Sequence, residues 1–404
     1  MVAEVGDTKM EFAGLVLDND DSLSENDDDE LDGDAVSETE LLQAFNKPYK
    51  LSVEKAVTLS RNYILHMSCT SDTEPSICIG LSDNTCEVYR LTTSGQLTKQ
   101  ATLDSHKDGV VNVKFSNNNS LYTGSADGCI KLWDLRDPLK SVVDFTDSSA
   151  TNSNQVKQLT CFDVSPNNRL LCGGTELYEG DAYLLFWDIR NRKLLGGYWE
   201  THSNDITSVT FHPSDVNRLA TGSTDGLINV YNLQEPTEDD ALDGSLNTES
   251  SVDRVLWYGD SGVCCVTHTA DLQLWDTALA TRYHTFTRQQ IAVAGQRQSA
   301  EHCYVAGVHS TSADGLLMLA GSNFHNGECV RTMTVQDNTQ LIPCSILTGN
   351  RQRIRASWYN SSTGVLITGG EHSVLSVWQP GSTVSSSQLK STTTKQKIHT
   401  QKPY

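Results

Sequence analysis

The stretch that decides the fold is LYTGSADGCIKLWDLR, which spans Leu121–Arg136. Altered copies follow as LATGSTDGLINVY at Leu219–Tyr231 and as LITGGEHSVLSVW at Leu366–Trp378. One phrase that returns at a fixed period indicates a chain built from repeated units, and a period in the forties is typical of propeller blades. The number of copies therefore sets the number of blades.

An aromatic residue closes most copies and marks the repeat. The markers are Tyr89, Trp133, Trp187, Tyr231, Trp275, a degenerate position near Arg331 or Thr332, and Trp378. Successive markers among the first five lie 44 or 54 residues apart. Seven markers predict an all-β chain folded as one seven-bladed propeller, in which the sixth copy is the weakest.

Within a copy the hydrophobic pattern is that of short strands. Val111–Phe115 and Ile130–Trp133 alternate between apolar and polar residues, as half-buried strands do. The pairs Asp127-Gly128 and Asp225-Gly226 lie between apolar runs and predict two-residue hairpin turns with positive backbone angles. Four such strands fit into 44 residues, the size of one blade.

These repeats resemble the WD40 family over roughly residues 50 to 380. The resemblance implies that a His, a Ser or Thr, an Asp and a Trp form a hydrogen-bonded chain in a blade. Carried over by position, these residues are His106, Ser125, Asp127 and Trp133 in the second copy, His202, Ser223, Asp225 and Tyr231 in the fourth, Trp275 in the fifth, and Trp378 in the seventh. The seventh copy departs from the pattern, because Asn350 stands at the His position and His372 near the Asp position.

The two ends of the chain predict how the ring closes. No outer strand follows Trp378 in the last copy, while residues 49–57 precede the first copy without a partner of their own. We expect residues 49–57 to supply the missing strand and so remove an open sheet edge. The predicted organisation is a disordered acidic tail over 1–45, the propeller over 46–381, and a disordered Ser/Thr/Lys-rich tail over 382–404.

Charge is concentrated at the N-terminus. The chain has a net charge of −21, and residues 1–40 hold fifteen Asp and Glu against one Lys. Such a run cannot bury enough apolar surface to fold alone. It is either a binding element for a basic partner, such as a ribosomal protein or a histone, or a solubilising tail.

Composition and motifs also limit which classes of function are possible. The eleven cysteines form no CxxC pair, and no apolar run approaches the roughly 18 residues of a membrane span. The chain contains no HExxH zinc motif, no P-loop and no GxSxG elbow. We expect a non-enzymatic, monomeric protein of the cytoplasm or nucleus that uses no cofactor or metal and binds neither membranes nor nucleic acid directly. The basic run Arg351–Arg355 is interpreted as a solvated loop.

The sharpest interaction motif occurs twice. Trp133-Asp134-Leu135-Arg136 returns one blade later as Trp187-Asp188-Ile189-Arg190. Within the WD40 family, such a pair resembles the signature of substrate receptors for cullin-4 ubiquitin ligases, whose arginines bind the ligase adaptor. Arg is suited to this because its planar fork binds carboxylates bidentately. The alternative is that the two Asp residues cap turns while the arginines are merely exposed.

A narrower resemblance extends from about Ile64 to Gly381. The segments 200–213, 222–230 and 366–371 are similar to the WD-repeat-containing protein 89 family. The resemblance supports the propeller fold. We expect a non-enzymatic protein-interaction scaffold, in which the insertions at 176–181 and 277–302 are sources of specificity because insertions in blades become loops. A cullin-4 substrate receptor is the first specific hypothesis, and an assembly factor for a basic client is the second.

Overall fold

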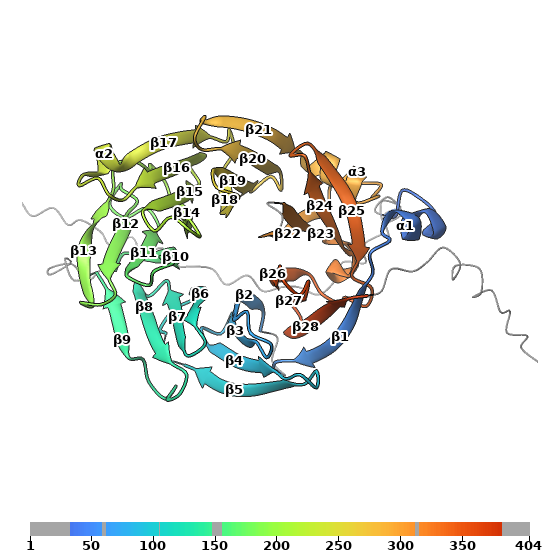
Figure 1. Cartoon of the computed structure of the whole chain (residues 1–404), viewed down its shortest axis with the longest axis horizontal. Coiled ribbons are helices and arrows are strands. Elements are labelled where there is room, and N and C mark those ends of the chain that lie inside the picture. The colour runs from blue at the N-terminus through green and yellow to red at the C-terminus, as the bar shows by residue number, and fades with distance from the viewer. Residues whose placement is uncertain (1–32, 59–61, 105, 148–155, 312–314, 382–404) are drawn as a thin grey trace, which may run out of the picture.

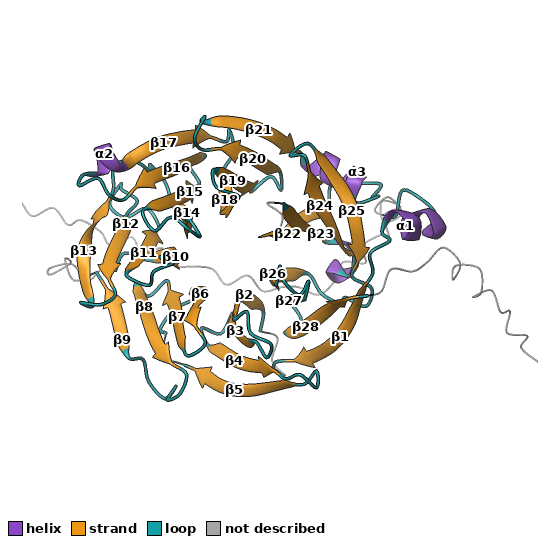
Figure 2. Ribbon diagram, in the orientation of Figure 1, coloured by secondary structure: helices purple, strands orange, loops and turns teal. Residues whose placement is uncertain are grey.

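The computed structural model describes residues 33–58, 62–104, 106–147, 156–311 and 315–381. These residues form seven four-stranded antiparallel sheets arranged as a closed ring (Figure 1). Helices are few and lie on the periphery (Figure 2). The prediction of an all-β, seven-bladed propeller is confirmed.

In blades 1 to 4 the strands follow one another from the ring centre outward. They are β2 (Ile64–Cys69), β3 (Ser76–Leu81), β4 (Cys86–Leu91) and β5 (Leu97–Leu103); β6 (Val110–Asn117), β7 (Ser120–Ser125), β8 (Cys129–Asp134) and β9 (Val143–Thr146); β10 (Leu159–Val164), β11 (Leu170–Thr175), β12 (Leu184–Asp188) and β13 (Lys193–Tyr198); β14 (Ile206–Phe211), β15 (Arg218–Ser223), β16 (Leu227–Asn232) and β17 (Leu242–Asn247).

Blades 5 and 6 repeat this order, and blade 7 takes its outer strand from the start of the chain. The strands are β18 (Val252–Tyr258), β19 (Gly262–Thr267), β20 (Leu272–Asp276) and β21 (Thr281–Phe286); β22 (Cys303–Ser310), β23 (Leu316–Ser322), β24 (Val330–Gln336) and β25 (Gln340–Ile346); β26 (Ile354–Tyr359), β27 (Leu366–Gly370), β28 (Val374–Pro380) and β1 (Tyr49–Ala56). The helices are α1 (Glu38–Ala44), α2 (Glu238–Ala241), α3 (Arg288–Ala294) and the 3₁₀ turn η2 (Phe324–Gly327).

The ring closes by pairing of its two ends. β1 runs antiparallel to β28, from Tyr49 opposite Pro380 to Ala56 opposite Val374. The hydroxyl of Tyr49 also donates to the carbonyl oxygen of Gly364 at 2.8 Å. The outer edge of blade 7 is thus covered by a strand more than 300 residues away in sequence, which leaves no open edge on β28.

Glycines in the second strands set the spacing between blades. A Cβ on Gly124 would lie 2.5 Å from the ring of Phe162 in the next blade, and one on Gly222 would lie 2.5 Å from Val252. Both distances are too short for a real contact. The repeated Thr-Gly-Ser phrase is therefore required by close packing of neighbouring blades.

The hairpin turns differ from the prediction. Ser125 pairs with Cys129, so the loop between β7 and β8 has three residues rather than two. Gly128 alone among the three has a positive φ, at 76°, and Gly226 repeats this in blade 4 at 86°. A three-residue loop that ends in a left-handed Gly places Asp127 in an ordinary conformation and leaves its carboxylate available for hydrogen bonds.

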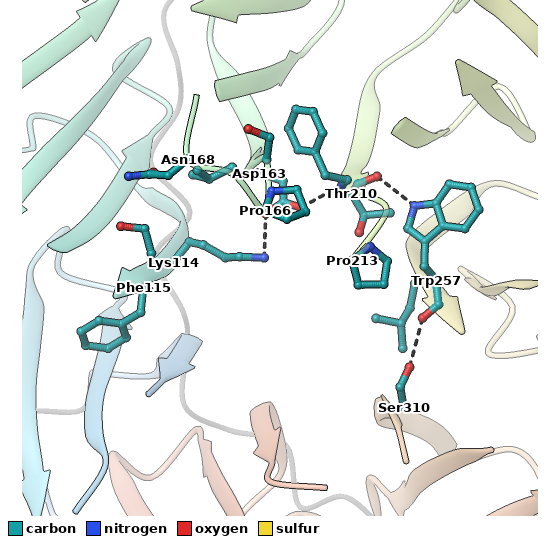
Figure 3. Close-up of a pocket in the computed structure, with 14 residues that line it drawn as sticks. Lys114, Phe115, Asp163, Pro166, Asn168, Thr210, Pro213, Trp257 and Ser310 are labelled. Atoms are coloured by element: carbon teal, nitrogen blue, oxygen red, sulfur yellow. Dashed lines mark hydrogen bonds and ion pairs between the residues drawn. The ribbon is translucent and has the colours of Figure 1, made fainter. Parts of the chain in front are cut away.

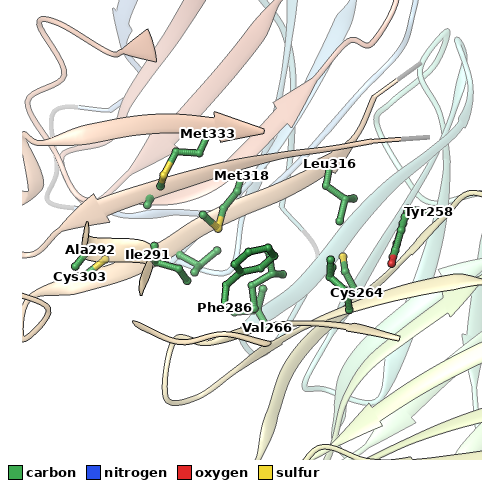
Figure 4. Packing of buried hydrophobic residues seen from close by; sticks show 14 residues of the cluster. Tyr258, Cys264, Val266, Phe286, Ile291, Ala292, Cys303, Leu316, Met318 and Met333 are labelled. Carbon is green, nitrogen blue, oxygen red and sulfur yellow. The ribbon is translucent and has the colours of Figure 1, made fainter. Parts of the chain in front are cut away.

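The sixth blade is complete, but its marker is not where the sequence pattern suggested. Met333, fully buried, lies opposite Met318, just as Trp133 lies opposite Leu121 in blade 2. The expected position at Arg331 or Thr332 is therefore wrong by one or two residues. Met333 packs in the apolar cluster between blades 5 and 6 (Figure 4), where an unbranched thioether fills the space of a ring.

Residues 33–45 correct the predicted boundary of the acidic tail. They contain α1, which begins at a capping box formed by Ser37 and Glu40, and they bury Leu41 and Phe45 against the ring. This segment is folded and docked, because its two apolar residues four positions apart share one helix face. The predicted tails over 1–32 and 382–404 lie outside the described residues.

Candidate protein-interaction surfaces

The direction of the strands divides the ring into two faces. We call the face where the inner strands begin the upper face, and the face where they end the lower face. His106 and Asp127 lie on the upper face, next to the starts of β6 and β8. Arg136 and Arg190 follow the ends of β8 and β12, so they lie on the lower face. The predicted residues therefore belong to two surfaces on opposite sides of the molecule.

The hydrogen-bonded chain of blade 2 runs through a residue that the sequence did not single out. His106 Nε2 lies 2.7 Å from Thr123 Oγ1, and Trp133 Nε1 donates to the same hydroxyl at 2.9 Å. His106 Nδ1 lies 3.2 Å from Asp127. The predicted member Ser125 instead donates to the carbonyl oxygen of Asp108 at 2.8 Å and holds the loop.

Asp127 is held ionised at the end of this chain. Burial raises the pKa of its carboxyl group, but hydrogen bonds from His106 and from the backbone N–H groups of Lys107 and Cys129 lower it further than burial raises it. The net effect places the pKa of Asp127 below its ordinary value. The chain thus has a structural role, because it ties the loop before β6 to the β7–β8 turn.

Blade 4 repeats the arrangement with one substitution. His202 lies 2.7 Å from Thr221 and 3.0 Å from Asp225. Tyr231, which replaces the Trp, places its hydroxyl 2.6 Å from the hydroxyl of Thr201. As in blade 2, the predicted Ser223 holds the loop, through the carbonyl oxygen of Asn204 at 3.0 Å.

In blades 5 and 7 the Trp keeps a shortened form of this chain. Trp275 Nε1 donates to Gln273 at 3.1 Å, and Trp378 Nε1 donates to Thr368 at 2.9 Å. Asn350 is buried and donates to the carbonyl oxygen of Gln352 at 2.7 Å, while His372 is exposed. The blade 7 residues named by position thus do not form a His–Asp pair, because an amide replaces the His.

On the lower face, Arg136 and Arg190 are exposed at equivalent turns of neighbouring blades. Arg136 forms a bidentate ion pair with Asp134, with Nε 2.9 Å from Oδ1 and Nη2 2.5 Å from Oδ2. These bonds lower the pKa of Asp134 to about 2. Asp188 instead accepts the backbone N–H and side-chain N–H of Asn191, at 3.1 and 2.7 Å.

The two tryptophans of the repeated motif do not reach this surface. Trp133 and Trp187 are only 2% and 1% exposed and pack between blades. They can position the turns that follow, but they cannot touch a partner. The accessible part of the motif consists of the two arginines, which are exposed, and of Asp134 and Asp188, which are partly exposed.

The lower mouth of the central channel is a shallow depression of about 410 Å³ (Figure 3). Lys114 and Asp163 form an ion pair across it at 2.7 Å, and Asp163 also accepts the backbone N–H of Phe211. Trp257 Nε1 donates to the carbonyl oxygen of Thr210 at 3.1 Å. The polar groups named here are hydrogen-bonded or ion-paired to one another. The positive charge of Lys114 is balanced by the negative charge of Asp163.

The insertion at 176–181 borders a depression of about 680 Å³ on the upper face. Its charged lining consists of Lys107, Asp108, Asp127, Glu176 and Glu179. The lining also includes two exposed apolar side chains, Val156 and Leu177. The surface is therefore acidic with apolar contact area, which suits a basic and partly apolar partner.

Half of the second insertion, 277–302, is regular structure. It contains β21, the outer strand of blade 5, and α3, whose Ile291 and Ala292 are buried in the cluster between blades 5 and 6 (Figure 4). Only the turns within it are surface loops. Its predicted role as a specificity loop stays a prediction for those turns alone.

The described ranges contain neither a cluster of metal ligands nor a membrane-spanning helix. No group of three or more His, Cys, Asp or Glu side chains there could hold a metal ion. None of the helices in that part of the chain is long and apolar enough to cross a membrane. All eleven cysteines are described, and ten of them are buried.

Comparison with known proteins places the chain in a family. Residues 38–275 match the family model for the β-propeller described as Nucleolar protein 10-like, N-terminal domain. The chain belongs to this WD-repeat propeller family. The match covers more than half of the sequence and includes both Trp-Asp-x-Arg motifs.

Individual relatives agree with this assignment. The WD repeat-containing protein 89 homolog of Dictyostelium discoideum is 25% identical over 68% of this chain and 73% of its own length. WD repeat-containing protein GTS1 of Arabidopsis thaliana is 30% identical over 50% of each chain. The predicted resemblance to the WD40 family and to WD-repeat-containing protein 89 is confirmed, and the WD-repeat relatives support a protein-interaction scaffold.

Proposed function

We propose that this scaffold is a substrate receptor of a cullin-4 ubiquitin ligase and that Arg136 and Arg190 bind the ligase adaptor. The observation that carries the proposal is their placement. Both guanidinium groups are exposed on the lower face, each two residues beyond the third strand of its blade, in blades that are neighbours. A single acidic surface on a partner can therefore engage both.

The ion pair of Arg136 with Asp134 prepares this arginine for binding. The side chain of Arg136 is 73% exposed, so the pair is a surface ion pair that contributes little to stability. An adaptor carboxylate can replace or share Asp134 at small cost, because the guanidinium fork already has a fixed orientation. An adaptor carboxylate does not have to replace Asp188 at Arg190, because the carboxylate of Asp188 is hydrogen-bonded to Asn191.

The test is affinity purification of the full chain from cells, followed by quantitative mass spectrometry. Arg136→Ala with Arg190→Ala should reduce recovery of the cullin-4 adaptor at least tenfold while the protein remains folded. Lys140→Ala with Arg169→Ala is the matched control, since it removes two exposed positive charges from turns on the same face of the same blades. Unchanged adaptor recovery from the first variant, or an equal loss from the control, would contradict the proposal.

A second candidate function rests on the acidic depression beside 176–181. We infer that it binds a basic client, such as a ribosomal protein or a histone, assisted by the acidic residues before Gly33. Exposed Leu177 and Val156 would add apolar contact to the charge attraction. The description of the matched family as nucleolar is compatible with such clients and leads us to propose a nuclear or nucleolar location.

This second function is tested with a purified histone or ribosomal protein as the probe. Glu176→Gln with Glu179→Gln should weaken binding several-fold, and affinity should fall steeply as salt is raised. Glu235→Gln with Asp239→Asn removes the same charge from exposed positions of blade 4 and should have little effect. Salt-insensitive binding that survives the first pair of substitutions would exclude this function for the depression.

A further inference from the structure

Arginines gather at the upper mouth of the central channel. Arg254 comes from the inner strand of blade 5, Arg355 comes from the inner strand of blade 7, and Arg353 immediately precedes that strand. The three line a hollow of about 390 Å³. The sequence interpretation of 351–355 as a solvated loop is therefore wrong for Arg355, which lies in β26, whereas Arg353 lies in the loop that leads into this strand.

The charge at this mouth is positive within a strongly acidic protein. The lining carries three guanidinium groups and one carboxylate, that of Asp253. Glu371, just outside the lining, lies 2.6 Å from Arg355 and 3.8 Å from Arg353. His66 and His309 lie deeper in the channel, and burial lowers the pKa of each imidazole to about 4, so both are neutral at pH 7.

The nearby carboxylates leave part of this cationic surface unsatisfied. Within the described part of the chain, Arg353 Nε is buried and has no hydrogen-bond partner. The side chains of Arg254 and Arg355 are 43% and 40% exposed and border the open channel. A buried N–H of a cation without an acceptor is costly, so an added carboxylate at this position would be favourable.

One acidic residue of the N-terminal segment already binds arginines on this face. Asp34 lies 3.0 Å from Arg297 and also contacts Arg331, which is 4% exposed. Arg297 precedes β22, and Arg331 begins the third strand of blade 6, so both lie toward the upper face. Asp34 is therefore an anchor from which the preceding residues can reach the channel mouth.

The sequence before this anchor fits the mouth in charge and in length. Nine acidic residues lie between Asp18 and Asp32. Fifteen residues of extended chain reach about 50 Å, whereas a folded domain of some 350 residues has a radius of gyration of about 20 Å. Because the run is tethered on the same face, its effective concentration at the mouth is of the order of millimolar.

We propose that Arg254, Arg353 and Arg355 form a binding site for a run of carboxylates, and that residues 18–32 of this chain are its occupant. The site lies on the face opposite Arg136 and Arg190, so it does not depend on adaptor binding. The same acidic run cannot occupy this site and assist the binding of a basic client at once, so the two interactions exclude each other.

Cross-linking within the full chain tests the occupant directly. A photo-cross-linking amino acid in place of Leu23 should label residues 253–255 or 353–355, as read by mass spectrometry. The labelling should fall at least tenfold when Arg254→Gln and Arg355→Gln are added, and it should persist with Arg136→Gln and Arg190→Gln as the matched control. Labels that fall elsewhere on the ring, or that are unchanged by the first pair, would overturn the proposal.

A binding measurement tests the site separately. The probe is a fluorescent peptide of residues 15–33, and the protein is the full chain with its nine acidic residues from Asp18 to Asp32 changed to Asn or Gln. Peptide affinity should drop at least tenfold with Arg254→Gln and Arg355→Gln, and should rise with Glu371→Gln, which removes a competing carboxylate. Equal affinity in all three proteins would overturn the site, and circular dichroism would show that each is folded.

Discussion

The indole nitrogen of Trp133 donates a hydrogen bond to the hydroxyl of Thr123 over 2.9 Å, and both side chains are buried. The same hydroxyl lies 2.7 Å from His106 Nε2. A single oxygen therefore serves two buried nitrogen groups from different parts of blade 2. Because its loss would leave both without a partner, this oxygen is the centre of the blade's polar network.

Thr123→Val should therefore destabilise the protein by about 2–4 kcal/mol, since it keeps the shape of the side chain but leaves two buried groups unsatisfied. Thr123→Ser, which keeps the hydroxyl, should recover most of this loss. The measurement is the urea midpoint followed by tryptophan fluorescence. Thr368→Val in blade 7, where the hydroxyl accepts from Trp378, is the comparison and should cost less. Equal midpoints for Thr123→Val and the native chain would contradict this role.

The repeat predicted the sheets, the closing strand and the identity of most blade markers, because each depends on local hydrophobic patterning. The polar chain was harder to assign, since Thr123 and Ser125 are chemically alike and separated by one residue. Alternation of strand faces does not distinguish them, because residues two apart point to the same side. Only their position along β7 does: Thr123 lies inside the strand, within reach of Trp133 and His106, and Ser125 ends the strand at the turn. The marker of blade 6 was missed because Met333 is not aromatic.

The docked helix α1 and the arginine cluster at the channel mouth were missed for different reasons. Residues 33–45 have the composition of a disordered tail, yet a capping box and the apolar pair Leu41 and Phe45 were a local signal for a docked helix. Arg254 and Arg353 are about a hundred residues apart and meet only because the inner strands converge on one channel. No local pattern contains that information.

The docked segment leads to a prediction about stability. Phe45 is 4% exposed and lies beneath the guanidinium of Arg331, whose Cζ is 5.4 Å from the ring centroid. Phe45→Ala should lower the free energy of unfolding by about 3 kcal/mol, the usual cost of removing a buried aromatic ring. Leu42→Ala on the exposed side of α1 is the control and should change it by less than about 0.5 kcal/mol. A similar effect of both substitutions, measured by urea denaturation, would argue against docking.

Thiol reactivity provides a separate check on the packing. Ten cysteines are buried, and burial raises the pKa of those such as Cys129 and Cys161 to about 12, so they hold little thiolate at neutral pH. Cys329 is the partly exposed one. We expect a thiol-labelling reagent to modify one cysteine rapidly in the native protein and all eleven in denaturant. Cys329→Ser should remove the rapid phase, and a rapid phase that remains would show that another cysteine is accessible.

The channel histidines give the protein a defined response to acid. Burial, together with a smaller effect of the neighbouring Arg254, lowers the pKa of both His66 and His309 to about 4. In the unfolded chain a histidine has an ordinary pKa of about 6.5. Between these two values the unfolded state binds more protons than the folded state, so the free energy of unfolding decreases as the pH falls from about 6.5 toward 4.

Replacing both histidines by glutamine should remove this part of the pH dependence. Glutamine is neutral throughout, and at position 309 it can still hydrogen-bond to Ser357, which lies 2.9 Å from the imidazole Nε2. The urea midpoint of the double variant should fall less than that of the native chain between pH 6.5 and 4.5. His372→Gln is the control, because His372 is exposed, and it should follow the native curve. Parallel curves for the double variant and the native chain would contradict this prediction. They would mean that the channel histidines have the same pKa in the folded and the unfolded states.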